Sequence, residues 1–315
     1  RVARELKDAG KPFAIVLNSA DPDTADAHAL ARELEKKYDA PVALVNCPDA
    51  KIGKNVTVAP FAYIDEDVVI GDNTYVGPHA TILKKTRIGE NCRIFPGAVI
   101  GAEPQDLKFH GEDSYVVIGN NTTIRECVTI HRGTASRGKT VVGDNCLIMA
   151  YCHVAHDCVL GNNIIMSNAT QLAGEVEVSD FAVVGGGTLV HQFTKIGCHA
   201  MIQGGTKLNK DVPPYVIAAH EPVAYFGINS VGLRRRGFSN EAIASIQEIY
   251  RQIFLEPAIR LTASSSEKTI VRPRQRLVLL NMVILLFCFS TRHGSCTIPS
   301  CLESNPNSLL VLKYH

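Results

Sequence analysis

An aliphatic residue, which we call the anchor, recurs at every sixth position through the middle of this chain. The series begins at Ile52, reaches Ile100 without a break and ends at Leu208. The phase is lost at three positions: Asp106, Glu112 and Ser136. A helix would scatter side chains of this spacing around its axis, whereas six is a multiple of the two-residue period of a strand. The phase therefore predicts a β-solenoid in which each flat face uses one hexapeptide.

Two further columns of residues run beside the anchors. The residue after an anchor is often glycine, as at Gly53 and Gly71, which suits a corner with an unusual backbone or a close approach. The fourth residue after an anchor is usually small, which indicates a second inward position. Four of the ten cysteines stand in this column: Cys92, Cys146, Cys152 and Cys158. We expect them to be buried, and we expect mostly reduced thiols because the chain has no C-x-x-C pair.

The composition agrees with an aliphatic core and narrows the function classes. Apolar residues make up 46% of the chain and tryptophan is absent, so Val, Ile, Leu and Ala must build the core. A net charge of +1 creates no global field toward nucleic acid or an acidic surface. We expect no nucleic-acid partner and no stable membrane insertion. Reduced thiols favour the cytoplasm, or an organelle matrix if the source is eukaryotic.

The domain organisation follows from where the phase starts and stops. Residues 1–47 show no hexad and predict a small α/β fragment of alternating helix and strand, foreign to the solenoid. Residues 48–212 form the solenoid and residues 213–256 a helical C-terminal piece. We expect residues 257–315 to be an atypical, poorly ordered tail. Its apolar run, 277–289, is shorter than the ~18 residues that indicate a membrane-spanning helix.

Local signals refine the expected C-terminal piece. Pro213 and Pro214 stop regular structure after the repeat. Ser239 is suited to cap a helix, and Ile243 and Ile246 begin one apolar face of that helix. The two gaps in the hexad phase, about 102–117 and 131–141, predict loops that leave the solenoid. Loops on a rigid scaffold are frequent carriers of function.

The strongest chemical signal is the segment MAYCHVAHDC, residues 149–158. It places His153, His156 and Asp157 on one coil. Acyl transfer from a thioester to an alcohol needs a general base that is unprotonated near neutral pH, which histidine supplies. A carboxylate can fix the imidazole tautomer and stabilise its cation. Zinc is the competing interpretation of the two histidines, but no third ligand is evident, so we expect no metal and no cofactor.

Seven segments resemble, in order and spacing, the UDP-N-acetylglucosamine acyltransferase family. They are QDLKFHGE, TIRECVTIHRGT, HVAHDC, NATQLAGEV, VVGGGTLVHQF, DVPPYVIA and GLRRRGFS. The resemblance covers about residues 48–256. It implies a mainly β fold, in which a left-handed parallel β-helix of hexapeptide repeats precedes a short helical region, and it implies a homotrimer. It further implies transfer of an (R)-3-hydroxyacyl group from acyl carrier protein to the 3-hydroxyl of UDP-N-acetylglucosamine, the first step of lipid A biosynthesis.

The resemblance also implies roles for individual residues. His156 would be the general base, Asp157 would orient it, and the N–H of Gly174 would stabilise the oxyanion. The residues that it places around the substrates are Asp106, Lys108, His153, Glu175, His191, Gln192, Gly204, Asn229 and Arg235. Gly204 matches the position that sets acyl-chain length, and glycine there predicts a medium-to-long chain.

Two positions depart from the family pattern. Glu175 stands where the family commonly has His, and Val231 stands where it commonly has Glu. Neither is the base, so we expect altered substrate affinity and intact chemistry. Glu175 is equally consistent with a plain exposed repeat residue.

A basic cluster stands near the end of the solenoid. Its members are Lys207, Lys210, Arg234, Arg235 and Arg236. Charge steering favours docking of the acidic acyl carrier protein on this cluster. A solvated group of charges at a helix start is the alternative.

Three further hypotheses compete with this assignment. Residues 133–140, GTASRGKT, satisfy the P-loop pattern, and residues 1–47 loosely resemble the GTPase domain of stage IV sporulation protein A through Asn18 and Asp21. A P-loop must open a helix, whereas hexad-phase strand follows here, so we do not expect a nucleotide-hydrolysing site. The remaining alternatives are N-acyl transfer to a nucleotide sugar and a non-catalytic scaffold like the gamma-carbonic-anhydrase-like subunits.

Overall fold

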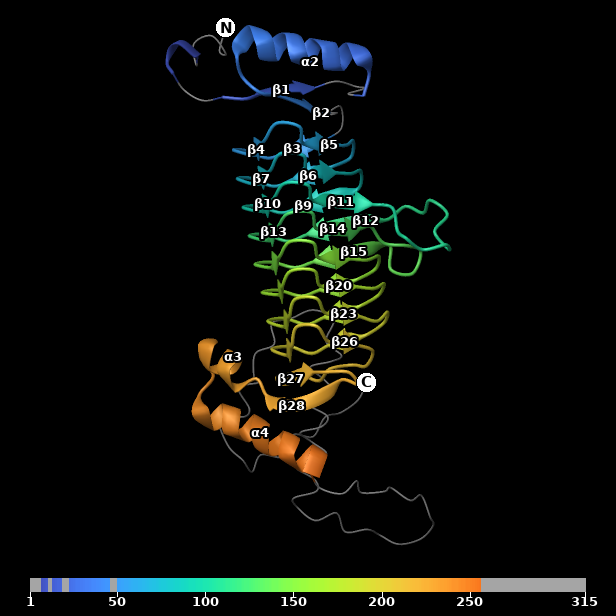
Figure 1. Cartoon of the computed structure of the whole chain (residues 1–315), viewed down its shortest axis with the longest axis vertical. Helices are drawn as coiled ribbons and strands as arrows, with labels where there is room; N and C mark the ends of the chain where they lie inside the picture. Colours follow the sequence, from blue (N-terminus) through green and yellow to red (C-terminus); the bar gives the residue numbers. More distant parts are fainter. Residues whose placement is uncertain (1–6, 11–12, 19–22, 46–49, 256–315) are drawn as a thin grey trace, which may run out of the picture.

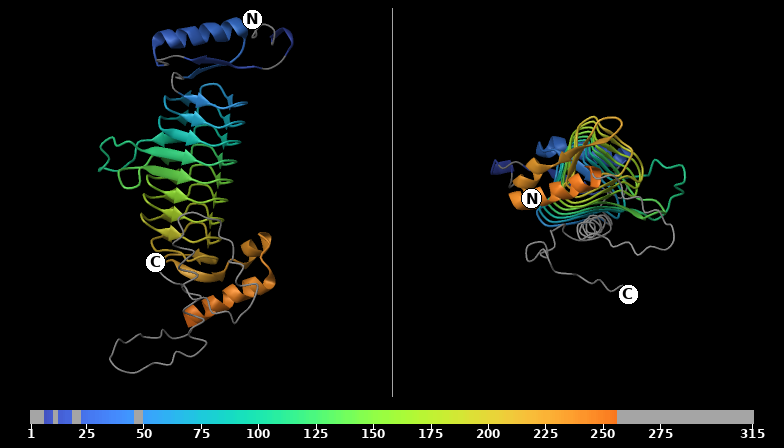
Figure 2. Two further views of the ribbon diagram at one scale, coloured as in Figure 1. Left: turned by 180° about the vertical axis from the view of Figure 1, so that it is seen from behind. Right: turned by 90° about the horizontal axis from the view of Figure 1, so that it is seen from below.

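The computed structural model describes residues 7–10, 13–18, 23–45 and 50–255. Its main body is a long coil of short strands with a helical element at each end (Figure 1). The coil is a left-handed parallel β-helix, so the predicted fold class is confirmed. Seen along its axis, successive coils superpose on one another (Figure 2).

Each turn of the coil contributes one strand to each of three parallel sheets. Sheet I contains β3 (Lys51–Ile52), β6 (Val69–Ile70), β9 (Thr86–Ile88), β12 (Tyr115–Ile118), β15 (Lys139–Val142), β18 (Val159–Leu160), β21 (Glu177–Val178) and β24 (Lys195–Ile196). Sheet II contains β4 (Thr57–Val58), β7 (Tyr75–Val76), β10 (Arg93–Ile94), β13 (Thr123–Ile124), β16 (Leu147–Ile148), β19 (Ile165–Met166), β22 (Val183–Val184), β25 (Met201–Ile202), β27 (Val216–Ala219) and β28 (Ala224–Ile228). Sheet III contains β5 (Tyr63–Ile64), β8 (Thr81–Ile82), β11 (Val99–Ala102), β14 (Thr129–His131), β17 (His153–Val154), β20 (Gln171–Leu172), β23 (Leu189–Val190) and β26 (Lys207–Leu208).

The hexad phase corresponds directly to inward and outward side chains. From β5 onward, the first residue of a two-residue strand faces outward and the second, the anchor, is buried in a continuous aliphatic core; in β3 and β4, at the end of the coil, Ile52 is exposed and Val58 is half-buried. The small residue four places later is also buried. Cys92, Cys146, Cys152 and Cys158 are buried free thiols, as predicted. The Cys158 Sγ lies 3.1 Å from the carbonyl oxygen of Ala173, and burial raises the pKa of this thiol to about 12.

At each corner of the coil, the close approach between backbones and the left-handed backbone conformation occur at two different residues. The sequence analysis expected both at the glycine after the anchor. The glycine after an anchor is needed for close approach: a Cβ on Gly71 would lie 2.6 Å from the carbonyl carbon of Gly89 on the next coil. The left-handed backbone conformation falls two residues later, as at Asn73 with φ 58° and Asn91 with φ 55°. Asparagine tolerates this conformation better than most side chains. The close-approach explanation is therefore confirmed, and the unusual backbone belongs to another position.

Both predicted loops leave the solenoid at the same corner, between sheets III and I. The first joins β11 to β12 and comprises residues 103–114; the second joins β14 to β15 and comprises residues 132–138. Figure 1 shows them projecting together on one side of the coil. They are shorter than expected because all four flanking strands are longer than the usual two residues, and β12 and β15 pair in register over four residues.

The N-terminal fragment contains one strand–helix–strand unit. β1 (Ile15–Asn18) and β2 (Val42–Val45) pair in parallel, and α2 (Ala25–Tyr38) connects them. Thr24 caps α2 by accepting a hydrogen bond from the Ala27 N–H at 3.3 Å. The helix expected before β1 and the Asp21 position fall largely outside the described residues.

The C-terminal piece is less helical than predicted. Beyond residue 212, β27 continues sheet II in parallel, and β28 adds to it antiparallel before α3 (Ser230–Arg235) and α4 (Asn240–Leu255) begin. The Ser239 hydroxyl accepts from the Ala242 N–H at 3.1 Å, as expected of a cap, and Ile243 is buried. The tail 257–315, with its apolar run, lies outside the described residues. Within the described part, every helix is too short or too polar to cross a bilayer.

Candidate active site

One corner of the coil, between sheets III and I, gathers the chemical groups. His156 follows β17, Gly174 follows β20 one coil further on, and both projecting loops leave from this corner. The stacking brings together residues that are far apart in sequence. It also fixes them on a rigid scaffold, because each neighbouring strand is held by parallel pairing above and below.

His156 and Asp157 form a buried hydrogen-bonded pair. The His156 Nδ1 lies 2.9 Å from the Asp157 Oδ2. The histidine is 8% exposed and the aspartate 0%. Asp157 takes the left-handed corner position, with φ 59°, which turns its short side chain back toward the preceding imidazole. With Nδ1 donating to this carboxylate, the tautomer leaves Nε2 as the acceptor that a general base requires.

The loop 132–138 encloses the Asp157 carboxylate with hydrogen-bond donors. The N–H of Thr134 lies 3.0 Å from Oδ1, its hydroxyl donates to Oδ2 at 2.6 Å, and the N–H of Arg137 donates to Oδ1 at 3.1 Å. The Asp157 N–H in turn donates to the Thr140 hydroxyl at 2.9 Å. These donors replace the water that a buried carboxylate has lost. The sequence analysis did not identify these loop residues.

This arrangement explains the P-loop pattern in residues 133–140. Glycines bracket a loop whose N–H groups converge on an anion, as in a phosphate-binding loop. Here the anion is the Asp157 carboxylate of the same chain, and β15 follows as a strand rather than a helix. The expectation that this segment is no nucleotide site is consistent with both observations.

The Nε2 side of His156 faces a glycine and a carboxylate. A Cβ on Gly174 would lie 2.5 Å from both Cε1 and Nε2 of the ring, so the glycine backbone packs directly against it. Within the described residues, the Gly174 N–H makes no hydrogen bond. Asp106, from the first loop, places Oδ2 3.8 Å from the His156 Nε2. A reacting oxygen beside Nε2 therefore lies next to an available N–H donor.

Two more histidines lie beside the pair on sheet III. His153 places Nδ1 2.7 Å from the Thr129 hydroxyl, and its ring packs edge-on against His131 with centroids 4.7 Å apart. Burial, together with electrostatic interaction with the neighbouring His153 and His156, lowers the pKa of His131 to about 4. Burial and His156 also lower the pKa of His153. Both neighbours are thus neutral near pH 7, and His131 is a further residue that the sequence analysis missed.

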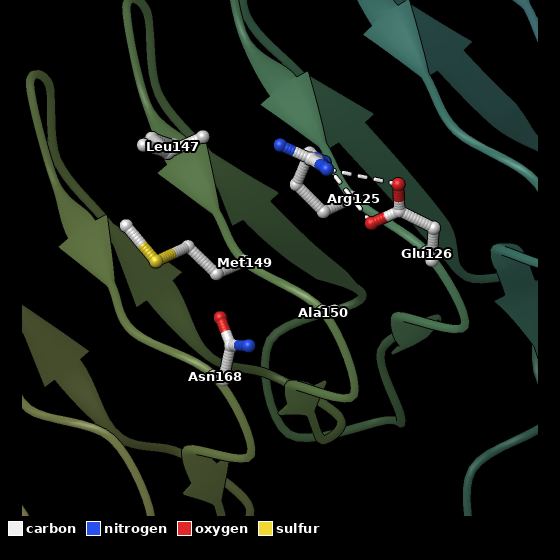
Figure 3. Close-up of a pocket in the computed structure, with 6 residues that line it drawn as sticks. All are labelled: Arg125, Glu126, Leu147, Met149, Ala150 and Asn168. Atoms are coloured by element: carbon white, nitrogen blue, oxygen red, sulfur yellow. Dashed lines mark hydrogen bonds and ion pairs between the residues drawn. The ribbon is translucent and has the colours of Figure 1, made fainter.

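The described residues contain no group of three or more His, Cys, Asp or Glu side chains placed to hold a metal ion. A separate hollow lies at the opposite edge of sheet III, near the corner with sheet II (Figure 3). There Arg125 and Glu126 pair at 2.9 Å, and Arg125 also lies over the Phe95 ring. The charges in this hollow already neutralise each other, so it is a weaker candidate than the His156 corner.

Comparisons with known proteins agree with this corner. A family model for the second domain of UDP N-acetylglucosamine O-acyltransferase matches residues 211–285, and one for bacterial transferase hexapeptides matches 49–84 and 139–174. The UDP-N-acetylglucosamine acyltransferase structure from Bacteroides fragilis is 55% identical, with a TM-score of 0.66 over 67% of this chain and 83% of that one. The structure from Francisella novicida is 36% identical, with a TM-score of 0.68 over 85% and 97%.

The chain belongs to the UDP-N-acetylglucosamine acyltransferase family. A curated relative from Burkholderia orbicola, an acyl-acyl-carrier-protein–UDP-N-acetylglucosamine O-acyltransferase, is 50% identical over 158 residues, half of this chain. The chain spans 60% of the length of that relative. The family match at 211–285 runs past residue 256, the predicted end of the resemblance. A family model for the stage IV sporulation protein A ATPase domain matches residues 1–59.

Other residues expected from the acyltransferase family lie around the same corner. Lys108 follows Asp106 in the first loop and is exposed; its N–H donates to the Asp106 Oδ1 at 3.0 Å. His191 and Gln192 follow β23, two coils beyond His156, at the exposed side of the corner. Gly204 follows β25 and lies at a different corner, between sheets II and III. Its part in setting chain length stays a prediction.

Two expected substrate residues have partners within the chain. Asn229 is 7% exposed: its amide oxygen accepts from the Gly232 N–H at 3.2 Å and its amide nitrogen donates to the His199 carbonyl at 2.9 Å. The Asn229 side chain thus caps α3. Glu175 is not a plain exposed residue, because only 18% of its side chain is exposed and it lies 3.9 Å from the Arg137 guanidinium. Val231, by contrast, is 57% exposed on α3.

The predicted basic cluster is divided in the structure. Figure 1 shows α3, which carries Arg234 and Arg235, on the opposite side of the coil from β26, which carries Lys207. Lys207 pairs with Glu221 at 2.8 Å. Arg236 turns inward and donates to the Phe181 carbonyl at 2.8 Å, and burial lowers its pKa. Three members of the cluster, Lys210, Arg234 and Arg235, are exposed.

Proposed function

We propose that this chain transfers an (R)-3-hydroxyacyl group from acyl carrier protein to the 3-hydroxyl of UDP-N-acetylglucosamine, the first step of lipid A biosynthesis. The observation that carries this proposal is the buried His156–Asp157 pair, whose free ring nitrogen faces the Gly174 backbone. The curated and structural relatives, which are UDP-N-acetylglucosamine acyltransferases, support the substrate class.

In the proposed reaction, His156 Nε2 accepts the proton of the sugar 3-hydroxyl while the hydroxyl oxygen attacks the thioester carbonyl carbon. The Asp157 carboxylate, 2.9 Å from Nδ1, stabilises the imidazolium that forms. The Gly174 N–H donates to the oxyanion of the tetrahedral intermediate. Collapse of the intermediate breaks the C–S bond, and His156 returns the proton to the departing thiolate of the carrier.

The surroundings of the base suit this chemistry. His131 and His153 have lowered pKa values and are neutral near pH 7, so they add no positive charge beside the developing imidazolium. Asp106 can accept a hydrogen bond from a neighbouring sugar hydroxyl, because its Oδ2 is 3.8 Å from Nε2. Exposed Lys108 and His191, with half-buried Gln192, then line the outer part of the nucleotide-sugar site.

The proposal extends to partners and compartment. Acyl carrier protein is the donor, docking through exposed basic residues such as Arg234 and Arg235, and the working form is a homotrimer. Gly204 leaves room for a medium-to-long acyl chain, and Arg235 contacts the substrates from α3. The reaction takes place in the cytoplasm, or in an organelle matrix in a eukaryotic source, without cofactor or metal.

The decisive experiment is an acylation assay with UDP-N-acetylglucosamine and 3-hydroxyacyl carrier proteins of several chain lengths. His156→Ala should lose activity by a factor of at least about 10³, since it removes the general base together with its proton shuttle. Lys54→Ala, on an exposed corner distant from the site, is the control. Full activity in His156→Ala would show that the base is wrongly assigned. Removal of residues 1–47 should leave the activity intact.

A further inference from the structure

The backbone and the side chain of Arg137 contact different neighbours. Its backbone N–H donates to the Asp157 Oδ1 at 3.1 Å. Its guanidinium donates to the Glu177 Oε1 at 2.7 Å and lies 3.9 Å from the Glu175 Oε2. The Arg137 side chain is 30% exposed, and its two acidic partners are 18% and 33% exposed. The ion pairs are therefore screened less than those of fully exposed residues.

The two carboxylates stand on the rigid solenoid, whereas Arg137 stands on a projecting loop. Glu175 directly follows Gly174, and its N–H donates to the His156 carbonyl at 3.0 Å. Glu177 belongs to β21 and is also held by Lys195 at 3.4 Å. Burial alone would raise the pKa of Glu177, but Arg137 and Lys195 outweigh it and lower this pKa. Glu177 thus remains charged near neutral pH.

We propose that Arg137 is a positioning residue, whose pairing with Glu175 and Glu177 holds the loop 132–138 closed over Asp157. With the loop closed, the N–H groups of Thr134 and Arg137 fix the carboxylate that orients His156. When the pairing is lost, the loop samples open positions and water replaces its donors around Asp157. The imidazole then loses its fixed orientation. This inference rests on the proposed acyl transfer, because it assigns Arg137 a part in that reaction.

The pairing also accounts for the departure at residue 175. The family resemblance leads one to expect histidine there, but a histidine that is neutral near pH 7 offers Arg137 no charge. A glutamate at this corner adds a second carboxylate to the one at Glu177.

The test compares Arg137→Gln, Glu177→Gln and the double variant in the acylation assay. We expect Arg137→Gln to lower kcat about tenfold with the KM for UDP-N-acetylglucosamine within twofold of wild type, because the loss concerns orientation and not binding. The double variant should be no slower than Arg137→Gln, since both changes break one interaction. Arg137→Lys should recover most of the rate.

Hydrogen–deuterium exchange gives a second readout that needs no activity. Amides of residues 132–138 should exchange faster in Arg137→Gln, while the melting temperature stays within a few degrees of wild type. Arg251→Gln is the control, because Arg251 also forms an ion pair, with Glu248 at 2.6 Å, but lies on α4 at the C-terminal end of the coil. It should change neither kcat nor the loop exchange.

Several outcomes would overturn the inference. A kcat within twofold of wild type in Arg137→Gln would do so, as would a loss carried entirely by KM, which would make Arg137 a substrate contact. A double variant whose loss is the product of the two single losses would also contradict it. If wild type transfers no acyl group, the proposed function is wrong. The role of the Arg137 ion pairs is then tested by hydrogen–deuterium exchange alone, and unchanged exchange of residues 132–138 in Arg137→Gln would refute it.

Discussion

Replacing Gly174 with alanine should show how strongly the reaction rate depends on the position of the His156 ring, in a variant that still has this base. The added Cβ would lie 2.5 Å from both Nε2 and Cε1 of His156, whereas ordinary van der Waals contact begins near 3.4 Å. The Nε2 side of the imidazole must therefore move away from residue 174 by about 1 Å. The Nδ1 side stays bound to the buried Asp157, so the ring changes its orientation. The Gly174 N–H remains present in the variant, so the main change is the place of the ring.

The size of the effect follows from the sensitivity of proton transfer to geometry. A displacement of about 1 Å at a reacting group costs on the order of 100-fold in rate. This corresponds to about 2.7 kcal/mol in the activation free energy. We therefore expect kcat of Gly174→Ala to fall about 100-fold, measured by mass spectrometry of the acylated nucleotide sugar at saturating substrates.

A double variant shows whether the effect passes through the ring. In a His156→Ala background the new Cβ no longer meets an imidazole, so Gly174→Ala should cost at most about twofold more, as expected for coupled residues. Gly77→Ala is the steric control, because its Cβ would lie 2.9 Å from the Ile94 carbonyl oxygen, far from the site. The reasoning is refuted if Gly174→Ala keeps full activity, or if it lowers the residual rate of His156→Ala by the same 100-fold.

Three further predictions address groups around the site. Because the pKa of His131 is about 4 when folded against 6.5 when unfolded, its contribution is fully present above pH 6.5 and is lost as the pH falls toward 4. The unfolding free energy of wild type relative to His131→Asn, from urea midpoints, should therefore fall by about 3 kcal/mol between pH 7 and pH 4; parallel pH profiles would contradict this. Among the described cysteines, iodoacetamide at pH 8 should label exposed Cys127 and spare Cys158, whose pKa burial raises to about 12; modified Cys158 in peptides from folded protein would argue against the burial. Asn229→Ala should lower stability in thermal unfolding by about 1 kcal/mol through loss of the α3 cap, and a raised KM with unchanged stability would instead favour substrate contact.

The candidate site was only partly predictable from the sequence. His156 and Asp157 are adjacent in the chain, so their pairing follows from residue types and spacing. Thr134 and Arg137 were missed, although the glycine-bracketed loop that carries them has the form of an anion-binding segment. The pattern was interpreted only as a misleading phosphate loop, because nothing in the sequence shows that an aspartate of the next coil supplies the anion.

The six-residue phase by itself determined the solenoid and its core. An anchor at every sixth residue buries one aliphatic side chain per strand. This does not depend on contacts with distant segments, because the alternation of inward and outward residues is local. The same phase located both loops as gaps, and it survives them. It could not show which of the three corners each gap occupies.

Tertiary structure alone decided which residues meet at that corner. Stacking coils with parallel pairing places Gly174 against His156 and carries Arg137 to Glu177, contacts between segments 18 to 40 residues apart. The loops interrupt the regular coil length, so the sequence interval between stacked residues changes along the chain. Distances and charges at the site depend on that stacking, and they become defined only when the coils are assembled.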